Sequence, residues 1–238
     1  MYSDLVLPTL SDRPFFYTNF VETIDGKVQV TTSEQSKYWP IGSPTDYATL
    51  IELRTYADVL IYGKNSALSF NHGQNLAKEE FKKAREKQGK NPDITYLIIC
   101  NSISNDDLAV LRGPHEKHTL LVMPESAQVD AEVEKVVKVV RVGEERVDVG
   151  LLSQWLYEQE YKQVLVEGGP SLLGSFLEKD LIDQVFLTIA PKIFGNEPEK
   201  TLTLVEGTLF KPEKIKNLEL LSVQQNKNEL FLRYQILH

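Results

Sequence analysis

Strand-like and helix-like segments alternate along nearly the whole of this 238-residue chain. Short apolar runs bounded by turn residues are typical of strands, and their alternation with amphipathic stretches indicates an α/β sheet with helices on its faces. We predict a mostly parallel central sheet of about eight to nine strands, helices on both faces, and a C-terminal antiparallel hairpin. The expected strands cover residues 15–21, 59–62, 94–100, 119–122, 136–142, 164–166, 184–189, 218–223 and 230–236.

Four helices are expected from their periodicity and from local capping signals. Ser43 suits the N-cap of the first helix, because Pro44 follows at the first helical position and Asp46 lies in the first turn. The second helix carries lysine and arginine alternating with glutamate, which is typical of a solvated face. The predicted helices cover residues 43–56, 76–88, 149–160 and 171–179, and residues 63–74 are expected to form a loop.

Composition limits the compartments and partners that suit the chain. The single cysteine, Cys100, excludes an intramolecular disulfide and favours a reducing compartment. Residues 1–10 lack the basic and apolar pattern of a signal peptide, and no later apolar run reaches membrane-spanning length. We therefore predict a cytoplasmic protein without membrane contact. A net charge of −8, without a basic stripe that contains aromatic residues, argues against nucleic-acid binding.

A strand-to-helix turn at residues 164–172 carries the strongest functional signal. An apolar strand ends at Glu167, and the chain turns through Gly168 and Gly169 into a helix with Pro170 at its first position. Two glycines let a ligand approach the backbone closely, and the N–H groups and dipole of a helix N-terminus favour a phosphate. The same pattern is compatible with a plain tight turn. Glu167, as a partly buried carboxylate, either faces a ligand or caps a neighbouring helix.

Other common sites find little support in the sequence. No G-x-G-x-x-G fingerprint, P-loop or nucleophile elbow occurs. His115 and His118 lie close together in a polar stretch, but zinc sites need three or four ligands, so we expect a solvent-exposed loop and no metal. Asp25 and Gly26 are typical of a turn, which needs no functional explanation.

Five motifs in a fixed order resemble the pyrimidine reductase domain of riboflavin biosynthesis. They are residues 13–27, 53–63, 166–172, 181–184 and 189–195. The resemblance covers nearly the whole chain and implies a single dihydrofolate-reductase-like domain over residues 1–238, NADPH as cofactor, and a homodimer. Bifunctional relatives also carry a deaminase with a zinc signature of paired cysteines, and this sequence does not contain that signature.

The resemblance also implies a reaction and a set of site residues. The ribosyl group of a ribosylamino-pyrimidine 5′-phosphate would be reduced to ribityl, with hydride from NADPH reaching the ring-opened C1′. Glu167 matches a substrate-facing carboxylate and is the predicted catalytic residue, with Asn19 and Thr23 as further substrate contacts. No side chain stands out as a general acid, so we expect the proton to come from water or substrate. The predicted cofactor contacts are Ser66, Val142, Gly168, Gly169, Pro170, Ser171 and Leu172.

The sequence departs from this family after Ser66. Relatives carry Asp-Asp-Pro and a downstream Leu-Thr-Val-Arg there, whereas residues 66–75 contain neither the aspartates nor the arginine. A site that lacks a polar partner discriminates poorly between substrates. Two alternatives therefore stay open: a reductase of the same fold that acts on another small heterocycle or carbonyl, and a non-catalytic dinucleotide-binding protein. The sequence also leaves open whether the pyrimidine is deaminated beforehand, and which cation selects NADPH over NADH.

Overall fold

The structure is a computed structural model that describes residues 1–2, 5–31, 40–69, 76–104, 107, 118–197 and 199–238. Its strands are β1 (Phe15–Thr23), β2 (Gln29–Val30), β3 (Val59–Gly63), β4 (Thr95–Ile99), β5 (Thr119–Met123), β6 (Lys138–Arg141), β7 (Gln163–Gly168), β8 (Ile182–Ala190), β9 (Thr201–Leu202), β10 (Asn217–Asn226) and β11 (Glu229–Leu237). Its helices are α1 (Pro44–Tyr56), α2 (Lys64–Ser69), α4 (Glu79–Lys87), α6 (Ala131–Glu134), α7 (Val149–Glu158), α8 (Pro170–Glu178) and the 3₁₀ helix η3 (Pro212–Lys214).

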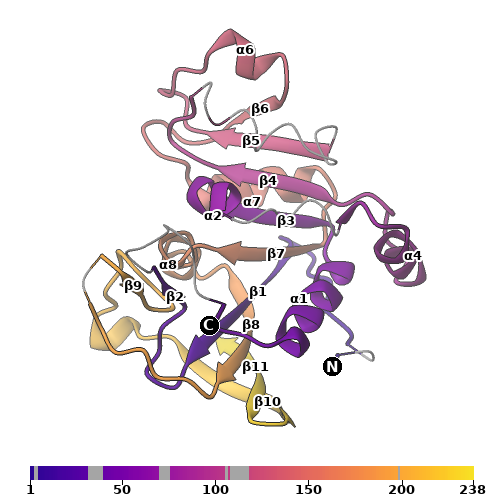
Figure 1. The fold of residues 1–238 in the computed structure, drawn as a ribbon. Helices are drawn as coiled ribbons and strands as arrows, with labels where there is room; N and C mark the ends of the chain where they lie inside the picture. Colours follow the sequence, from indigo (N-terminus) through magenta and orange to yellow (C-terminus); the bar gives the residue numbers. More distant parts are fainter. Residues whose placement is uncertain (3–4, 32–39, 70–75, 105–106, 108–117, 198) are drawn as a thin grey trace.

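Nine of the described strands form one sheet, in the order β10-β11-β8-β1-β7-β3-β4-β5-β6 (Figure 1). All neighbouring pairs from β8 to β6 are parallel, whereas β11 pairs antiparallel with both β8 and β10. The predicted mostly parallel α/β sheet with a C-terminal antiparallel hairpin is thus confirmed. The hairpin extends one edge of the sheet, and β1 lies near the middle, between β7 and β8.

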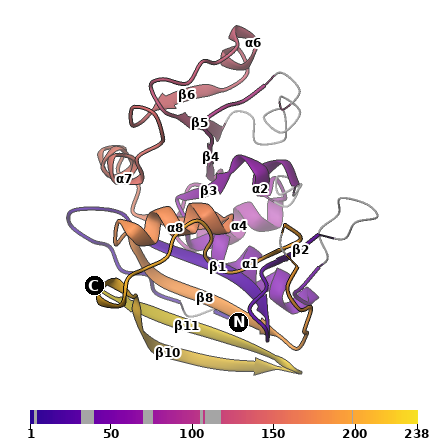
Figure 2. The ribbon, with the colours of Figure 1, turned by 90° about the vertical axis from the view of Figure 1, so that its left-hand side faces the viewer.

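The sheet divides the core into two layers, one on each face. Along β1 the side chains alternate, because successive residues of a strand point to opposite faces. Phe15 and Tyr17 pack in the layer that also contains Leu53 of α1 and Phe81 of α4. Phe16 packs in the other layer, together with residues from α7 and α8. Figure 2 shows α7 and α8 on one side of the sheet and α1, α2 and α4 on the other.

Three local predictions need correction. Residues 63–74 were expected to form a loop, but Lys64–Ser69 form α2, which follows β3 without a break, and residues 70–75 lie outside the described part. The helix expected from residue 76 is α4, which begins at Glu79. The strand expected over residues 136–142 is shorter, because α6 and its final turns precede β6. Short elements give too few residues for a period to be recognised.

The charges of α4 suggested a solvated helix, but the structure shows that α4 is partly buried. Its Arg85 is only 1% exposed. The guanidinium donates hydrogen bonds to the carbonyl oxygens of Arg54 and Ala57 at the C-terminal end of α1, and to that of Asn91. The Arg54 carbonyl also accepts from the backbone N–H of Ala57, so the cation from α4 adds to the capping of the C-terminal end of α1 and joins the two helices.

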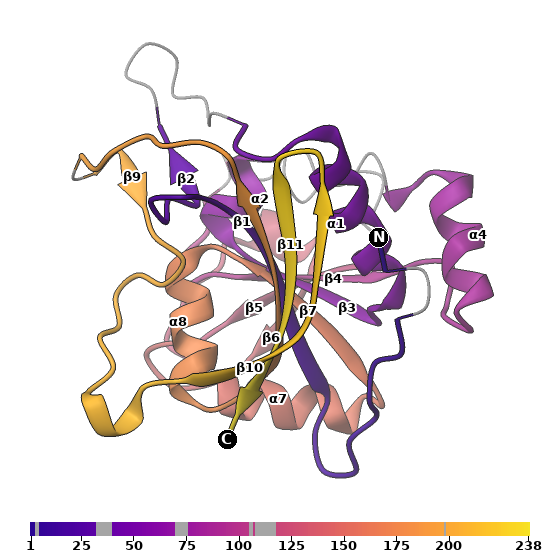
Figure 3. The same ribbon diagram turned by 90° about the horizontal axis from the view of Figure 1, so that it is seen from below.

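A small two-stranded ribbon lies beside the main sheet. Its strands β2 and β9 are each two residues long, and they pair antiparallel through Gln29 with Leu202 and Val30 with Thr201 (Figure 3). No alternation is recognisable over two residues, so the sequence did not predict the ribbon. None of the helices in the described ranges combines the length and apolarity needed to cross a membrane.

Candidate active site

Two adjoining cavities lie where the central parallel strands end. One, of about 440 Å³, lies between β1 and α1, and we call it the α1 cavity. The other, of about 560 Å³, lies at the ends of β3 and β4 beside the N-terminus of α8, and we call it the α8 cavity. Gln29, Ser66, Gly169 and Pro170 line both cavities. Ligands that occupied the two cavities would therefore lie against each other.

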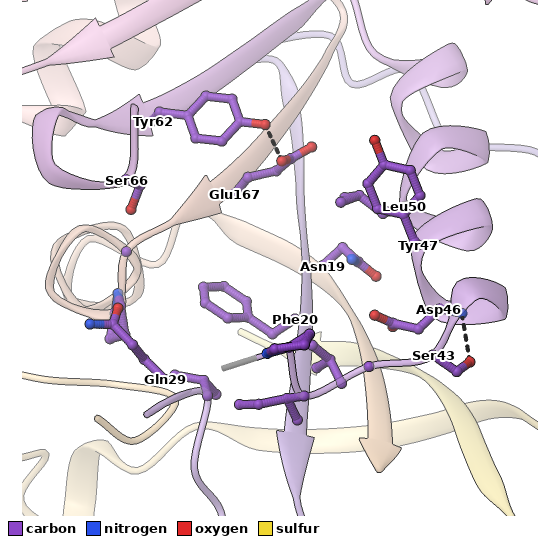
Figure 4. A pocket seen from close by; sticks show the side chains of 17 residues that line it. Asn19, Phe20, Gln29, Ser43, Asp46, Tyr47, Leu50, Tyr62, Ser66 and Glu167 are labelled. Carbon is purple, nitrogen blue, oxygen red and sulfur yellow. Dashed lines mark hydrogen bonds between the residues drawn. The ribbon is translucent and has the colours of Figure 1, made fainter. Parts of the chain in front are cut away.

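Glu167 lies in the wall of the α1 cavity, and its carboxylate is held by two buried side chains, of which Figure 4 shows Tyr62. Arg54 donates from Nε to Oε1 and from Nη2 to Oε2, both at 2.6 Å. The hydroxyl of Tyr62 donates to Oε2 as well. These two partners of Glu167 are a guanidinium and a phenol, and neither belongs to a helix N-terminus. Sequence analysis placed Glu167 beside a ligand but did not find these partners.

The electrostatics of this cluster keep Arg54 charged and Tyr62 neutral. Burial lowers the pKa of Arg54, but the charge and hydrogen bonds of Glu167, together with Tyr62 and Tyr96, outweigh burial, and the guanidinium pKa lies above its ordinary value. Burial also raises the pKa of Tyr62 well above its ordinary value, so the hydroxyl keeps its proton. Arg54 is fully buried, and an unpaired charge there would be strongly unfavourable. Glu167 therefore has two roles: it lines the α1 cavity, and it is the counter-ion of Arg54.

Two further polar side chains reach the α1 cavity from opposite sides. Asn19 comes from β1, and Asp46 comes from the first turn of α1; Figure 4 shows Asn19 between Glu167 and Asp46. Burial raises the pKa of Asp46 to about 6. Asn19 was predicted at such a site, but Asp46 was interpreted only as a helix-start residue. A first-turn aspartate carries no signal in a single sequence that distinguishes a buried side chain from an exposed one.

Thr23 is fully buried at the end of β1 and is absent from the lining of both cavities. Its hydroxyl donates to Asp25 at 2.5 Å and accepts from the backbone N–H of Lys27 at 2.9 Å. Asp25 in turn accepts from the backbone N–H groups of Phe194 and Gly195. These contacts fix the turn after β1, as the Asp25-Gly26 signal indicated.

The N-terminus of α8 faces the α8 cavity without a side-chain cap. Gly169 occupies the N-cap and so has no side chain to offer, whereas Ser43 caps α1 and Asp148 caps α7. Gly168 has a φ of +96°, a backbone conformation that favours glycine, and the peptide bond that follows it is cis. A Cβ atom at Gly169 would lie 3.3 Å from the Ser66 hydroxyl. The open backbone and the uncapped helix end fit a phosphate.

The remaining predicted cofactor contacts divide into two groups. Ser66, Pro170, Ser171 and Leu172 line the α8 cavity together with Gly169. Val142 does not line it: the side chain packs in the core. The cavity also contains two cations that no motif singled out, Lys64 and Arg146. No group of three potential metal ligands occurs among the described residues; residues 115–117, near His118, lie outside them.

A parallel sheet with two adjoining cavities at its strand ends, one against an uncapped helix N-terminus, is typical of the class of α/β proteins that bind a phosphate-bearing ligand beside a second small molecule. Comparison with known proteins narrows this class. The chain belongs to the family described as the RibD C-terminal domain, whose sequence profile matches residues 14–232.

Two relatives share the name 2,5-diamino-6-ribosylamino-4(3H)-pyrimidinone 5′-phosphate reductase. The protein from Archaeoglobus fulgidus is 27% identical, with 84% of this chain and 90% of the relative covered. The protein from Methanothermobacter thermautotrophicus is 29% identical, with coverage of 82% and 86%. A crystal structure of a pyrimidine reductase-like protein from Corynebacterium diphtheriae has a TM-score of 0.75 at 23% identity, and covers 94% of this chain and 92% of its own. That likeness supports the fold.

Proposed function

We propose that this protein is an oxidoreductase of riboflavin biosynthesis that reduces the ribosyl group of a ribosylamino-pyrimidine 5′-phosphate to ribityl. The observation that carries the proposal is the shared wall of the two cavities, formed by Ser66, Gly169 and Pro170, which would hold a nucleotide and a substrate in contact. Membership of the RibD C-terminal family and the names of the two relatives support the same reaction.

We propose the α8 cavity as the site of a pyridine nucleotide, and NADPH as that nucleotide. Its diphosphate would lie on the uncapped N-terminus of α8, against Gly168, Gly169, Pro170, Ser171 and Leu172, with Ser66 opposite. Lys64 and Arg146 supply positive charge to the same cavity. Val142 remains a predicted contact, but because it is buried, any contribution would pass through the backbone of the turn that follows it.

We propose the α1 cavity as the substrate site. When bound, a reduced nicotinamide would supply hydride to C1′ of the ring-opened ribosylamino group, whose C1′–nitrogen double bond also takes up a proton at nitrogen. Asn19 and Glu167 would orient the substrate, and Arg54, buried behind the cavity wall, would hold Glu167 in place. Thr23 remains a predicted contact that would act by fixing the turn after β1.

We also propose a cytoplasmic homodimer that binds neither membrane nor nucleic acid. The hairpin supports self-association, because several of its large apolar side chains are exposed, and contiguous exposed apolar surface marks interaction sites. They are Leu218, Leu220, Leu221, Val223 and Leu237. The net charge of −8 disfavours a polyanionic partner.

The test of the proposed function is an assay of nucleotide oxidation with the purified protein and 2,5-diamino-6-ribosylamino-4(3H)-pyrimidinone 5′-phosphate, followed by identification of the ribityl product. Glu167→Gln should lower kcat at least tenfold and leave the Kd for NADPH within twofold, because the substituted group faces the α1 cavity. Glu158→Gln, the same change on the exposed face of α7, is the control. Unchanged turnover in Glu167→Gln would reject the role of this carboxylate, and absence of turnover in the unsubstituted protein would reject the reaction.

A further inference from the structure

Asp46 is a carboxylate of the α1 cavity that the fold leaves incompletely satisfied. Its side chain is only 9% exposed, and within the described residues Oδ1 has no hydrogen-bond partner. Buried polar atoms are rarely left without partners, because an unsatisfied acceptor reduces stability. Since Asp46 lines a cavity, a ligand can supply the missing donor.

The surroundings of Asp46 hold the carboxylate in place but do not neutralise it. A Cβ atom at Gly42 would lie 2.0 Å from Oδ2, so the glycine leaves the space that this oxygen occupies. Glu229 of β11 lies nearby and accepts hydrogen bonds from the backbone N–H and the hydroxyl of Ser43. Lys192, the neighbouring cation, donates to the carbonyl oxygens of the segment before Gly42. This end of the cavity is therefore negative and rich in acceptors.

The arrangement of the two cavities decides which part of the substrate meets Asp46. The reacting C1′ must lie at the wall shared with the α8 cavity, and Figure 4 shows Asp46 across the α1 cavity from Ser66 in that wall. Either the phosphate or the pyrimidine ring of the substrate can extend to the far side. Two nearby carboxylates, Asp46 and Glu229, would repel a phosphate but would attract the N–H groups of an amino-substituted ring.

Building on the proposed function, we propose that Asp46 accepts a hydrogen bond from the 2-amino group of the pyrimidine and thereby selects the 2-amino substrate over its deaminated counterpart. In the deaminated ring a carbonyl oxygen replaces the amino group, so two acceptors would face each other without a proton between them. Sites that are built to pair a polar group discriminate strongly against analogues that lack it. Asp46 is thus a specificity-determining residue of the α1 cavity.

The preference should depend on pH. The pKa of Asp46 is raised to about 6, because burial and the charge of Glu229 together outweigh the hydrogen bond from Thr188 and the charge of Lys192. Above pH 6 the carboxylate accepts from the 2-amino group. Below pH 6 the protonated acid can donate to a 2-oxo group, so the preference for the 2-amino substrate should shrink as the pH falls through this range.

The test compares kcat/KM for the 2-amino substrate and the 2-oxo substrate in three proteins: the unsubstituted chain, Asp46→Asn and Asp12→Asn. Asp12 is an exposed carboxylate outside both cavities, so its variant makes the same chemical change without the proposed effect. We expect at least a tenfold preference for the 2-amino substrate in the unsubstituted chain and in Asp12→Asn. In Asp46→Asn the preference should fall to threefold or less, mainly through KM, because an amide can either donate or accept.

Binding of the ring alone separates this proposal from the proposed reaction. Calorimetry with 2,6-diamino-4(3H)-pyrimidinone, in the presence of NADP⁺, should give at least tenfold weaker binding to Asp46→Asn. Turnover with an unchanged preference in Asp46→Asn, or a preference for the 2-oxo substrate in the unsubstituted chain, would overturn the role of Asp46 and leave the reductase standing. Ring binding that depends on Asp46, without turnover, would leave Asp46 standing and reject the reductase. Ring binding that ignores Asp46 would overturn its role in either case.

Discussion

The two cavities of this protein are built in different ways. The α8 cavity is lined by the contiguous residues Gly169–Leu172, which present backbone groups and a helix end. The α1 cavity depends on side chains from separate elements, such as Asn19, Asp46 and Glu167, and two of these are buried carboxylates. Backbone recognition needs few charged side chains and adds little electrostatic cost, whereas buried carboxylates must be paired or left strained. The unfavourable free energy of burying carboxylates therefore falls mainly on the α1 cavity.

The largest effect should come from breaking the buried ion pair of the α1 cavity. Arg54→Met keeps much of the side-chain volume but leaves Glu167 without its cation, and should reduce the free energy of unfolding by roughly 3–5 kcal/mol. Urea denaturation measures the change. The double variant with Glu167→Gln should recover part of the loss, because no carboxylate is then left unpaired. A loss below about 1 kcal/mol in Arg54→Met would mean that the pair is solvated.

Replacing Asp46 should increase the free energy of unfolding, whereas replacing Arg54 should reduce it. Its pKa, raised to about 6 in the folded protein, lies above its ordinary value of 3.8, so its contribution to stability is full below pH 4 and is lost as the pH rises through 6. Asp46→Asn removes this titration and should stabilise the protein by roughly 2–3 kcal/mol above pH 7, with no gain near pH 4. Denaturation curves across this range measure the difference. A gain that does not depend on pH would rule out the buried charge as its cause.

A substitution in the α8 cavity should lower the affinity for the nucleotide. Gly169→Val places a branched side chain against Ser66 in the proposed phosphate site and should weaken NADPH binding at least tenfold, which corresponds to about 1.4 kcal/mol. Fluorescence titration gives the Kd. Asp46→Asn, which changes only the α1 cavity, should keep the Kd within twofold. Equal affinity in Gly169→Val and the unsubstituted chain would show that the turn has only a structural role.

The smallest effect is expected at Asn19. Asn19→Ala removes one neutral side chain from the α1 cavity and should raise KM for the substrate about fivefold, the equivalent of one ordinary hydrogen bond of about 1 kcal/mol. The Kd for NADPH should stay constant. A change in the nucleotide Kd with a constant KM would assign Asn19 to the other cavity.

The difference between the two cavities, one built from contiguous residues and one from separate elements, also explains what could be predicted from the sequence. The strand, the glycines and the helix start at residues 163–172 are consecutive, so local pattern alone identified the α8 N-terminus. The charged partner of Glu167 is Arg54, 113 residues away, and no local pattern links two such positions. Arg54 belonged to a recognised motif, yet its burial and its carboxylate partner follow only from the packing of α1 on the sheet.

In the fold, too, the features that rest on local sequence patterns were predictable, and those set by distant contacts were not. The parallel sheet and the hairpin of β10 and β11 rest on long apolar runs and were predictable. The ribbon of β2 and β9 has only two residues on each strand, and its pairing is set by the surrounding chain. Arg85 appeared on a helix whose charges alternate, and only the position of α4 against the end of α1 explains its burial.

The central position of β1 has a consequence for how the chain must fold. Its ladder partners are β7 and β8, and the Thr18 hydroxyl donates to the carbonyl of Val166, which lies 148 residues later. Contacts of such high sequence separation close late, because the loop entropy must be overcome before they form. During synthesis the apolar segment Phe15–Tyr17 would therefore stay unpaired until its partner strands β7 and β8 have been made. We expect slow refolding, and a need for chaperones, to accompany this topology.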